Sequence, residues 1–241
     1  VEHILNRLPR TYSGGEAQRV AFGKTIVRSA RATLLDEPLS NIDALLRLEM
    51  RIELKRIHRQ LGRTFLYVTH DQAEAMAMGE RIGLIDNGEI KQIGTPVELY
   101  EKPKNRFVAS YMGSPPMNFF DCDFEEDRGK WVLNGGFFRL DISEFGKPVS
   151  EKLKDRRITL GVRPENIRVL EEPRKNTIEA KIMVAERLGA KVILDMGITG
   201  TDLFKAVAPP EQSDKPGETK WLEFDLEKIH VMDRATGEVL V

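Results

Sequence analysis

Hydrophobic residues recur along the first hundred positions with two different spacings. Between Leu46 and Leu61 they step by three or four positions, which places them on one face of a helix that must pack against another surface. The apolar runs at 33–35 and 64–68 are short and indicate buried strands of a parallel sheet. The alternation of strands and helices predicts a doubly wound α/β sheet.

Further elements of this first part are predicted from local signals. The segment 1–8 is typical of the tail of a helix that stops near Pro9. Small and apolar residues predict a helix over 16–30 and a short one over 72–78, and a third strand is expected at 81–85. The sequence Asp86-Asn87-Gly88 predicts a hairpin turn into a strand at 89–93.

The pattern changes after the segment 113–116, Gly-Ser-Pro-Pro, where consecutive prolines disfavour a helix and predict a linker. Short runs rich in β-branched and aromatic residues follow, which is typical of a small β-barrel. These runs are 119–124, 130–133, 137–140, 158–162, 177–188, 191–196, 202–207, 220–224 and 230–232. The sequence therefore predicts two domains, an α/β domain over 1–113 and a β-barrel domain over 114–241.

Composition limits which partners the chain can bind directly and in which compartment we expect it. The net charge is −1 and no basic run is present, which disfavours nucleic acid as a direct partner, because such binding depends on clustered Lys and Arg. The single Cys122 excludes an internal disulfide and fits a reducing compartment. No apolar stretch approaches the roughly 20 residues that span a bilayer, and no secretory signal is present. We expect a cytoplasmic chain that reaches a membrane only through a partner.

Ser13, Gly14 and Gly15 stand where a helix is predicted to begin. Free backbone N–H groups and the positive end of the helix dipole favour an anion at such a place. The alternative is an ordinary N-cap serine followed by flexible glycines. An anion site is favoured because Gln18-Arg19-Val20 follows in register and an acidic strand end comes shortly after.

Asp36 and Glu37 end an apolar strand, at the edge where ligands meet an open α/β sheet. Asp36 can hold Mg²⁺ through its water shell, while Glu37 can orient or deprotonate the water that attacks a γ-phosphate. The alternative is a solvated pair of acids beside Pro38. We expect the acids to be functional because Leu34 and Leu35 should bury the strand up to this point.

His70 ends the next predicted strand and should emerge at the same edge as Glu37, where it could contact a γ-phosphate. The other histidines, His3, His58 and His230, are predicted to be structural or solvated. Gly23-Lys24-Thr25 looks like the end of a phosphate loop, but it falls inside a predicted helix, where the N–H groups are already bonded. We therefore do not assign it to phosphate binding.

With these residues together, the chain resembles the ATP-binding subunits of ABC carbohydrate importers of the maltose-transporter type. Matching motifs are found at 12–16 (signature), 34–43 (Walker B and D-loop), 69–72 (switch histidine), 94–96, 113–119 and 161–165. The resemblance implies the C-terminal half of a P-loop NTPase ABC domain, followed by an all-β oligonucleotide-binding-like regulatory domain.

In that family two subunits dimerise head to tail around ATP and Mg²⁺. The resemblance implies that the signature touches a nucleotide held by the second subunit, whereas the strand-end residues serve a nucleotide on the chain's own phosphate loop. It also implies transmembrane permease subunits as partners, a peripheral position at the inner face of the cell membrane, and a regulatory protein on the β-domain. The residues carried over are Glu37 and His70 for catalysis, Asp36 for the metal, and Ser13, Gly14, Gly15, Glu16 and Asp43 for the nucleotide.

Two departures from the family pattern stand out. The 241 residues contain no phosphate loop of the form G-x-x-x-x-G-K-[ST] and begin with Val1, so we expect a fragment that neither binds nor hydrolyses ATP alone. Tyr12 and Glu16 replace the usual leucine and glutamine of the signature, and an acid there would oppose a polyphosphate.

The alternative function is a non-catalytic dimerising or regulatory module that binds a signalling protein or small effector. An ABC protein of the ribosome or of DNA repair is disfavoured.

Overall fold

A computed structural model gives the fold. It describes residues 2–28, 30–40, 42–136, 138–143, 149–151, 153, 155–198, 203–212 and 215–241. The chain divides into two compact units, Val1–Ile82 and Gly83–Val241. The predicted division after residue 113 differs in position from these units and stays a prediction.

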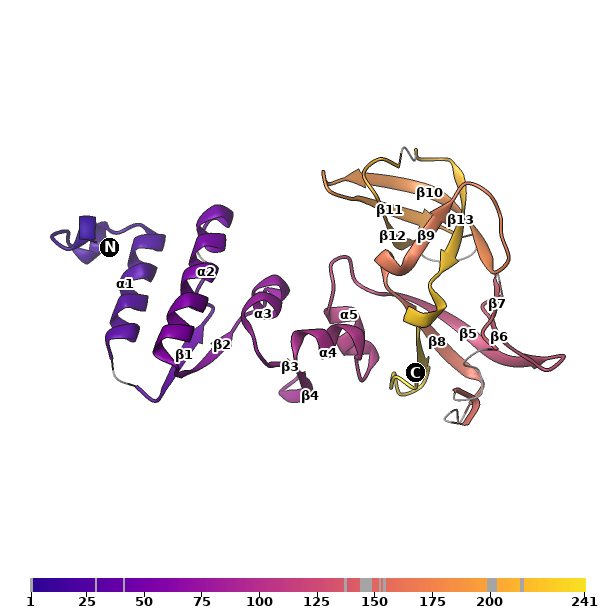
Figure 1. The fold of residues 1–241 in the computed structure, drawn as a ribbon, viewed down its shortest axis with the longest axis horizontal. Helices are drawn as coiled ribbons and strands as arrows, with labels where there is room; N and C mark the ends of the chain where they lie inside the picture. The colour runs from indigo at the N-terminus through magenta and orange to yellow at the C-terminus, as the bar shows by residue number, and fades with distance from the viewer. Residues whose placement is uncertain are drawn as a thin grey trace. The chain divides into compact units, whose positions relative to one another are not determined.

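The first unit contains the α/β elements that the sequence predicts. They are the 3-10 turns η1 (Glu2–Ile4) and η2 (Pro9–Thr11), then α1 (Gly14–Val27), β1 (Ala32–Asp36), α2 (Ala44–Leu61), β2 (Thr64–Val68) and α3 (Gln72–Met78) (Figure 1). β1 and β2 pair in parallel, with Asp36 opposite Val68. The predicted helical tail at 1–8 is not found, because residues 2–8 as described contain the 3-10 turn η1 and no α-helix.

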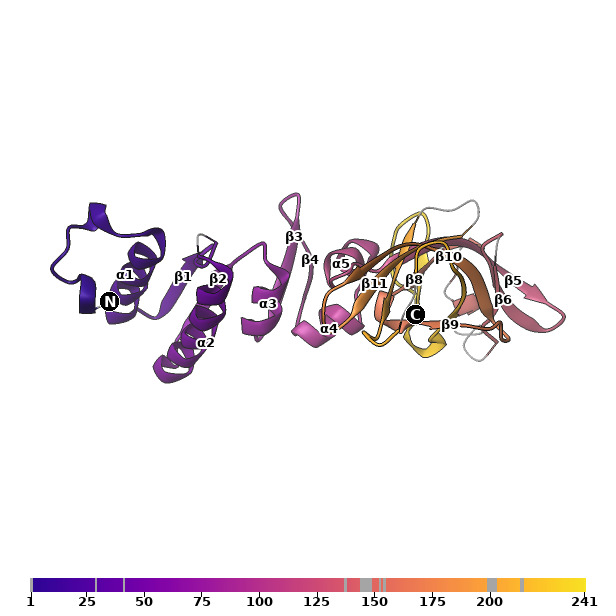
Figure 2. The ribbon, with the colours of Figure 1, turned by 90° about the horizontal axis from the view of Figure 1, so that it is seen from above.

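The apolar face of α2 packs into the core of this unit, as its spacing predicts. Met50 and Leu54 are buried together with Phe22 of α1 and Leu35 of β1. Figure 2 shows α2 running alongside β1 and β2. The helix ends at Gly62, whose φ of 59° is the left-handed conformation that glycine adopts at helix ends.

The expectation that both strands are fully buried is wrong. Leu34, Leu66 and Val68 are 72%, 59% and 51% exposed, whereas Leu35 on the other face of β1 is 7% exposed. Burial alternates along β1 because the helices cover only one face of the two-stranded sheet. The third predicted strand does not join this sheet in the described structure. It forms β3 (Ile82–Asp86) and pairs with β4 (Glu89–Gly94).

The second unit is rich in antiparallel strands. After β4 come α4 (Pro96–Glu101), α5 (Arg106–Tyr111), β5 (Asn118–Asp127), β6 (Lys130–Asn134), β7 (Arg139–Asp141), β8 (Arg157–Val162), the turn η3 (Pro164–Asn166), β9 (Ile167–Leu170), β10 (Thr177–Arg187), β11 (Val192–Gly197), β12 (Phe204–Ala208), β13 (Thr219–Phe224), the turn η4 (Leu226–Lys228) and β14 (His230–Asp233). The β3–β4 hairpin is confirmed, with Asn87 and Gly88 at φ 49° and 81°.

These strands divide between two five-stranded sheets, in the orders β12-β11-β10-β13-β9 and β14-β8-β5-β6-β7 (Figure 1). One apolar core joins them, in which the ring of Phe120 stacks on Phe224 at 5.6 Å and meets Phe204 edge-on at 5.5 Å. Most of the predicted strands are thus confirmed. Phe137 and Asp202, which were expected to begin two of them, lie outside the described residues.

The segment 113–116, where the sequence predicted a linker, lies within the second unit and is partly buried there. Pro115 is buried, and so are Met112 and Met117 on either side of the segment. Gly113 has a φ of 123°, and a Cβ at this position would lie 2.8 Å from Nη1 of Arg163. Glycine is required here for both its backbone conformation and its lack of a side chain.

Candidate functional site

The chain turns sharply where β1 ends. Glu37 has a φ of 45°, a left-handed conformation that is uncommon outside glycine. The turn is held by the Glu37 amide, which donates to the carbonyl of Val68 on β2 at 2.9 Å, and by the Ser40 hydroxyl, which donates to the carbonyl of Glu37 at 2.9 Å. The Glu37 side chain is thereby placed at the carboxyl edge of the sheet.

The structure brings Glu37 and His70 into direct contact at this edge. Oε1 of Glu37 lies 2.6 Å from Nδ1 of His70 and accepts a second hydrogen bond, at 3.1 Å, from the His70 amide. The hydrogen bond to Glu37 and the charge of that carboxylate raise the pKa of His70. His70 remains 78% exposed, so a ligand can reach the pair.

Asp36 is exposed at the end of β1. Among the residues that the structure describes, no cluster of three His, Cys, Asp or Glu side chains could hold a metal. A lone exposed carboxylate fits Mg²⁺, which commonly keeps several waters and takes its other ligands from substrate phosphates. The assignment of Asp36 to the metal stays a prediction.

Ser13 forms the N-cap of α1 through a capping box. The Ser13 Oγ accepts from the amide of Glu16 at 3.3 Å, and Oε2 of Glu16 accepts from the amide of Ser13 at 2.8 Å. Oε1 of Glu16 also accepts from Nη1 of Arg7 at 3.1 Å. Ser13 is therefore an N-cap, as the alternative interpretation in the sequence analysis predicted. Ser13 and Gly14 are still exposed, so a second molecule can approach them.

Asp43 stands at the start of α2, near the signature turn. Its Oδ1 accepts from the amide of Leu46 at 3.0 Å, which caps the helix. A Cβ on Gly15 would lie 3.4 Å from Cδ2 of Leu46, so the signature turn and the first turn of α2 are neighbours. Asn41, in the same motif as Asp43, lies outside the described residues.

A buried polar network next to His70 escaped the sequence analysis. Glu74 is 3% exposed, and its Oε2 accepts from the hydroxyls of Tyr67 at 2.9 Å and Thr69 at 3.0 Å. Burial, followed by the hydrogen bond to Glu74, raises the pKa of Tyr67. The sequence offered one signal, because a Glu three residues after an N-cap such as Asp71 is typical of a helix start. That signal predicts an exposed capping residue and not a buried acceptor.

Arg47 of α2 connects this network to the segment before Asp43. Its guanidinium donates to the carbonyl of Ile42 at 3.0 Å and lies 3.6 Å from Oδ2 of Asp71 and 4.0 Å from Oε1 of Glu74. The residues on either side of His70 are thus tied to the start of α2. Such ties restrict how far His70 can move relative to Asp43.

The residues that the sequence analysis did not assign to the site have the following places where they are described. Lys24 and Thr25 lie inside α1, where the Thr25 hydroxyl donates to the carbonyl of Ala21 at 2.9 Å. His58 packs edge-on against Phe65 with ring centroids 5.0 Å apart. His230 is partly buried, and the side chain of His3 lies outside the description.

Comparison with known proteins gives matches to both parts of the chain. The family described as the MalK OB fold domain matches residues 113–167, and the TOBE domain matches residues 160–232. The trehalose/maltose import ATP-binding protein MalK of Thermococcus litoralis is 42% identical over 98% of this chain. The chain is thus similar in sequence to import ATP-binding proteins. Its α/β and β-rich parts agree with the C-terminal half of an ABC ATPase followed by a regulatory β-domain.

Other relatives of the chain are named after different substrates. The xylose/arabinose import ATP-binding protein XacK of Haloferax volcanii is 40% identical over the whole chain, and the multiple sugar-binding transport ATP-binding protein MsmK of Streptococcus mutans is 39% identical over 97% of it. The matches span 64%, 62% and 65% of the lengths of the three relatives, so the chain covers less than two thirds of each. No helix in the described ranges is long and apolar enough to cross a membrane.

Proposed function

We propose that this chain supplies the catalytic edge and the signature of an ATPase that drives carbohydrate import. The contact between Glu37 and His70 carries the proposal, because it joins a carboxylate and an imidazole at the carboxyl edge of two parallel strands. The names of the relatives support ATP as the substrate. The imported sugar does not follow from these residues.

Each residue of the edge has a separate role in the proposal. Glu37 orients or deprotonates the water that attacks the γ-phosphate, which is the task of a general base. His70 donates a hydrogen bond to the γ-phosphate, and the contact with Glu37 raises the pKa of the ring. Asp36 holds Mg²⁺ through water, and this ion neutralises charge on the phosphates.

The signature turn serves a nucleotide on a second subunit. Ser13, Gly14 and Gly15 lie at the N-terminus of a 14-residue helix, where backbone N–H groups and the helix dipole favour a phosphate. Glu16 already caps this helix and pairs with Arg7, so its carboxylate is partly neutralised before a nucleotide arrives. Asp43 stands beside the turn and completes the proposed contact between subunits.

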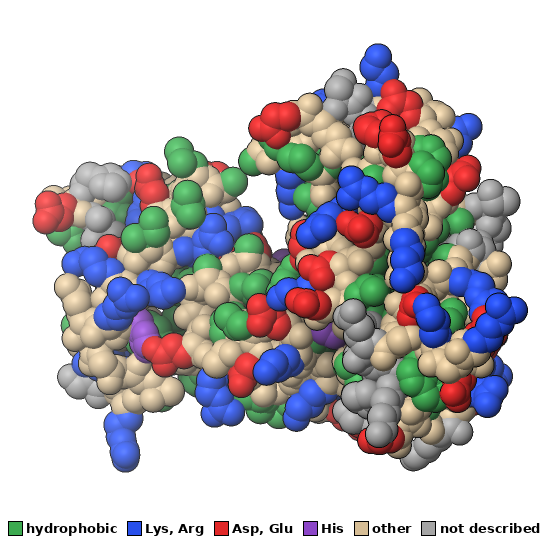
Figure 3. Space-filling view, turned by 45° about the vertical axis from the view of Figure 1, so that its right-hand side comes forward, with side chains coloured by type: hydrophobic (Ala, Val, Ile, Leu, Met, Phe, Trp, Pro, Cys, Tyr) green, Lys and Arg blue, Asp and Glu red, His purple; other side chains and the backbone are tan. Residues whose placement is uncertain are grey.

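The remaining partners follow from the relatives. We propose transmembrane permease subunits as membrane partners, with the ATPase peripheral at the inner face of the cell membrane, and a regulatory protein on the β-domain. On the face shown in Figure 3, acidic and basic side chains are interspersed and do not form a basic stripe. A mixed surface of this kind is less suited to nucleic acid than to proteins.

The test compares the 241-residue chain alone with the same chain joined behind the phosphate-loop segment of the Thermococcus litoralis relative. We expect hydrolysis of ATP only by the joined protein, because the phosphate cradle and its lysine are needed to hold ATP. Glu37→Gln should reduce turnover at least about 100-fold and leave ATP binding intact. Asn87→Gln, at an exposed hairpin tip, is the control. Robust ATP turnover by the chain alone, lost on Glu37→Gln, would contradict the need for the phosphate loop. If the joined protein binds ATP but does not hydrolyse it, a non-catalytic module is favoured instead.

A further inference from the structure

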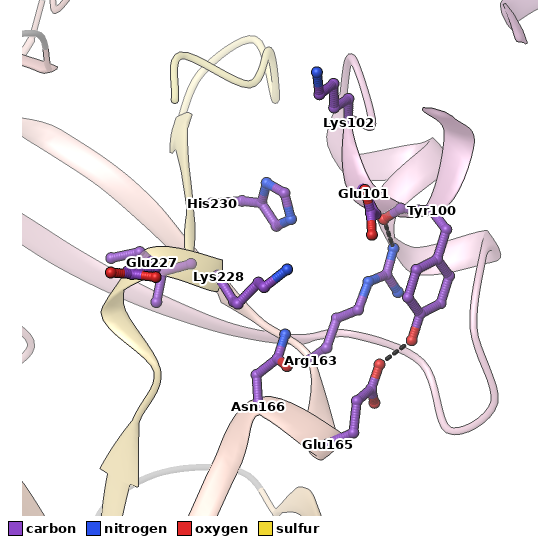
Figure 4. A pocket seen from close by; sticks show the side chains of 10 residues that line it. Tyr100, Glu101, Lys102, Arg163, Glu165, Asn166, Glu227, Lys228 and His230 are labelled. Atoms are coloured by element: carbon purple, nitrogen blue, oxygen red, sulfur yellow. Dashed lines mark hydrogen bonds between the residues drawn. The ribbon is translucent and has the colours of Figure 1, made fainter. Parts of the chain in front are cut away.

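The second unit contains a cavity that the proposed ATPase function does not use. Its volume is about 340 Å³, and it is lined by the end of α4, the turn η3 and the segment from η4 into β14. These three segments are far apart in sequence and converge on one space (Figure 4). Nearly all the side chains around it are polar or charged.

Arg163 brings a buried positive charge to the wall of the cavity. It is 2% exposed, lies over the ring of Tyr100 at 3.7 Å, and donates to the backbone carbonyls of Tyr100 and Met112. Burial lowers the pKa of Arg163 to about 10, and in the described part of the chain no carboxylate forms a salt bridge with it. The charge is therefore balanced by carbonyl dipoles and not by an opposite charge, an arrangement that favours an added anion.

Three further polar groups are directed toward the cavity in Figure 4, namely the ammonium of Lys228, the amide of Asn166 and the ring of His230. Burial, followed by the charge of Arg163, lowers the pKa of His230 to about 4. Lys102, which follows α4, also belongs to the lining.

The carboxylates of the lining are placed differently. Glu165 accepts a hydrogen bond from the Tyr100 hydroxyl, and burial raises its pKa. Glu227 is directed away from the other labelled side chains in Figure 4. Glu101 is the third carboxylate of the lining and would oppose an anion in the cavity.

We propose that this cavity binds a small metabolite through an oxyanion, either a phosphate or a carboxylate group. Lys228, Asn166 and His230 would contact the oxyanion, and Arg163 would supply a fixed positive charge behind it. The ligand would hold α4, η3 and β14 together, since each segment contributes to the lining. The proposal is independent of the ATPase function, because every residue in it belongs to the second unit.

The test follows the histidine ring signals of the 241-residue chain by NMR, during titration with inorganic phosphate and then with malonate at constant ionic strength. We expect the signals of His230 to shift saturably while those of His58 do not, and the pKa of His230 to rise when the anion is bound. Glycerol serves as the neutral control. A response to phosphate alone or to malonate alone identifies the oxyanion class.

Two substitutions with opposite expected effects separate binding from a general loss of structure. Lys228→Gln should weaken binding about tenfold or more, because it removes a charge-assisted contact. Glu101→Gln should tighten binding, because it removes the opposing carboxylate. Lys104→Gln, an exposed lysine outside the cavity, should leave the affinity unchanged. No saturable shift of His230 with either anion, or equal weakening by Lys228→Gln and Lys104→Gln, would overturn the proposal.

Discussion

At the scale of single residues, the pair of Glu37 and His70 depends on an unusual backbone position. Glu37 adopts a left-handed φ of 45°, and its amide and carbonyl are both held by neighbours. Such conformations carry strain and persist where the surroundings fix them, often at functional sites. The sequence predicted that the two side chains share an edge, but it gave no sign of the turn that joins them.

The hydrogen bond that Glu37 accepts from the His70 ring predicts how the pKa of His70 responds to substitution. Glu37→Gln should lower the pKa of His70 toward its ordinary value of about 6.5, whereas Asp36→Asn should leave it nearly unchanged. Because the folded-state pKa is raised, the pair favours folding below the ordinary pKa, and this contribution is lost as the pH rises through the raised value. Ring NMR signals followed against pH measure both variants. An unchanged pKa in Glu37→Gln would contradict the contact.

Glu74 is the residue whose role the sequence could not show, because its burial depends on the packing of α3 against β2. Glu74→Ala should lower the free energy of unfolding by about 1–3 kcal/mol, since the hydroxyls of Tyr67 and Thr69 lose their acceptor. Glu80→Ala, at an exposed position, is the control and should change it little. Urea unfolding measures the difference. Equal stabilities of the two variants would show that the network contributes nothing.

At the scale of elements, α2 has one buried apolar face and further apolar residues that are exposed. The spacing of Leu46, Met50 and Leu54 predicted the buried face correctly, because helical periodicity and burial coincide there. The apolar runs of β1 and β2 led to the wrong prediction that both strands are fully buried, for a different reason. Their continuous hydrophobicity is typical of a sheet covered on both faces, whereas one face of this sheet is exposed.

The two faces of α2 provide a matched pair of substitutions. Leu54→Ala should reduce the free energy of unfolding by about 2–5 kcal/mol, because Leu54 is 1% exposed and its removal leaves a cavity. Ile52→Ala should change it by less than about 0.5 kcal/mol, because Ile52 is 66% exposed and alanine favours a helix. Thermal unfolding followed by circular dichroism checks both. A larger effect at Ile52 would mean that the face assignment is wrong.

At the scale of the whole molecule, the order and spacing of the motifs predicted more about the protein than the local hydrophobic pattern did. The order of signature, strand-end acids and switch histidine indicated the family, and the relatives agree with it over nearly the whole chain. The strands of the second unit were found in outline, since alternating patterns and turns are local signals. Their division between two sheets and the packing of residues 113–116 depend on contacts distant in sequence, such as Gly113 with Arg163.

The central claim is that one nucleotide site is shared between two subunits, with Glu37 from one and Ser13 from the other. It is tested most directly by mixing two variants of the joined protein, Glu37→Gln and Ser13→Arg, each inactive alone. A mixed dimer then has one site with both changes and one complete site. We predict that mixing restores up to about a quarter of the unsubstituted ATPase rate, because half of randomly formed dimers are mixed. If the mixture stays as inactive as its components while mixed dimers form, the site is not shared in this way.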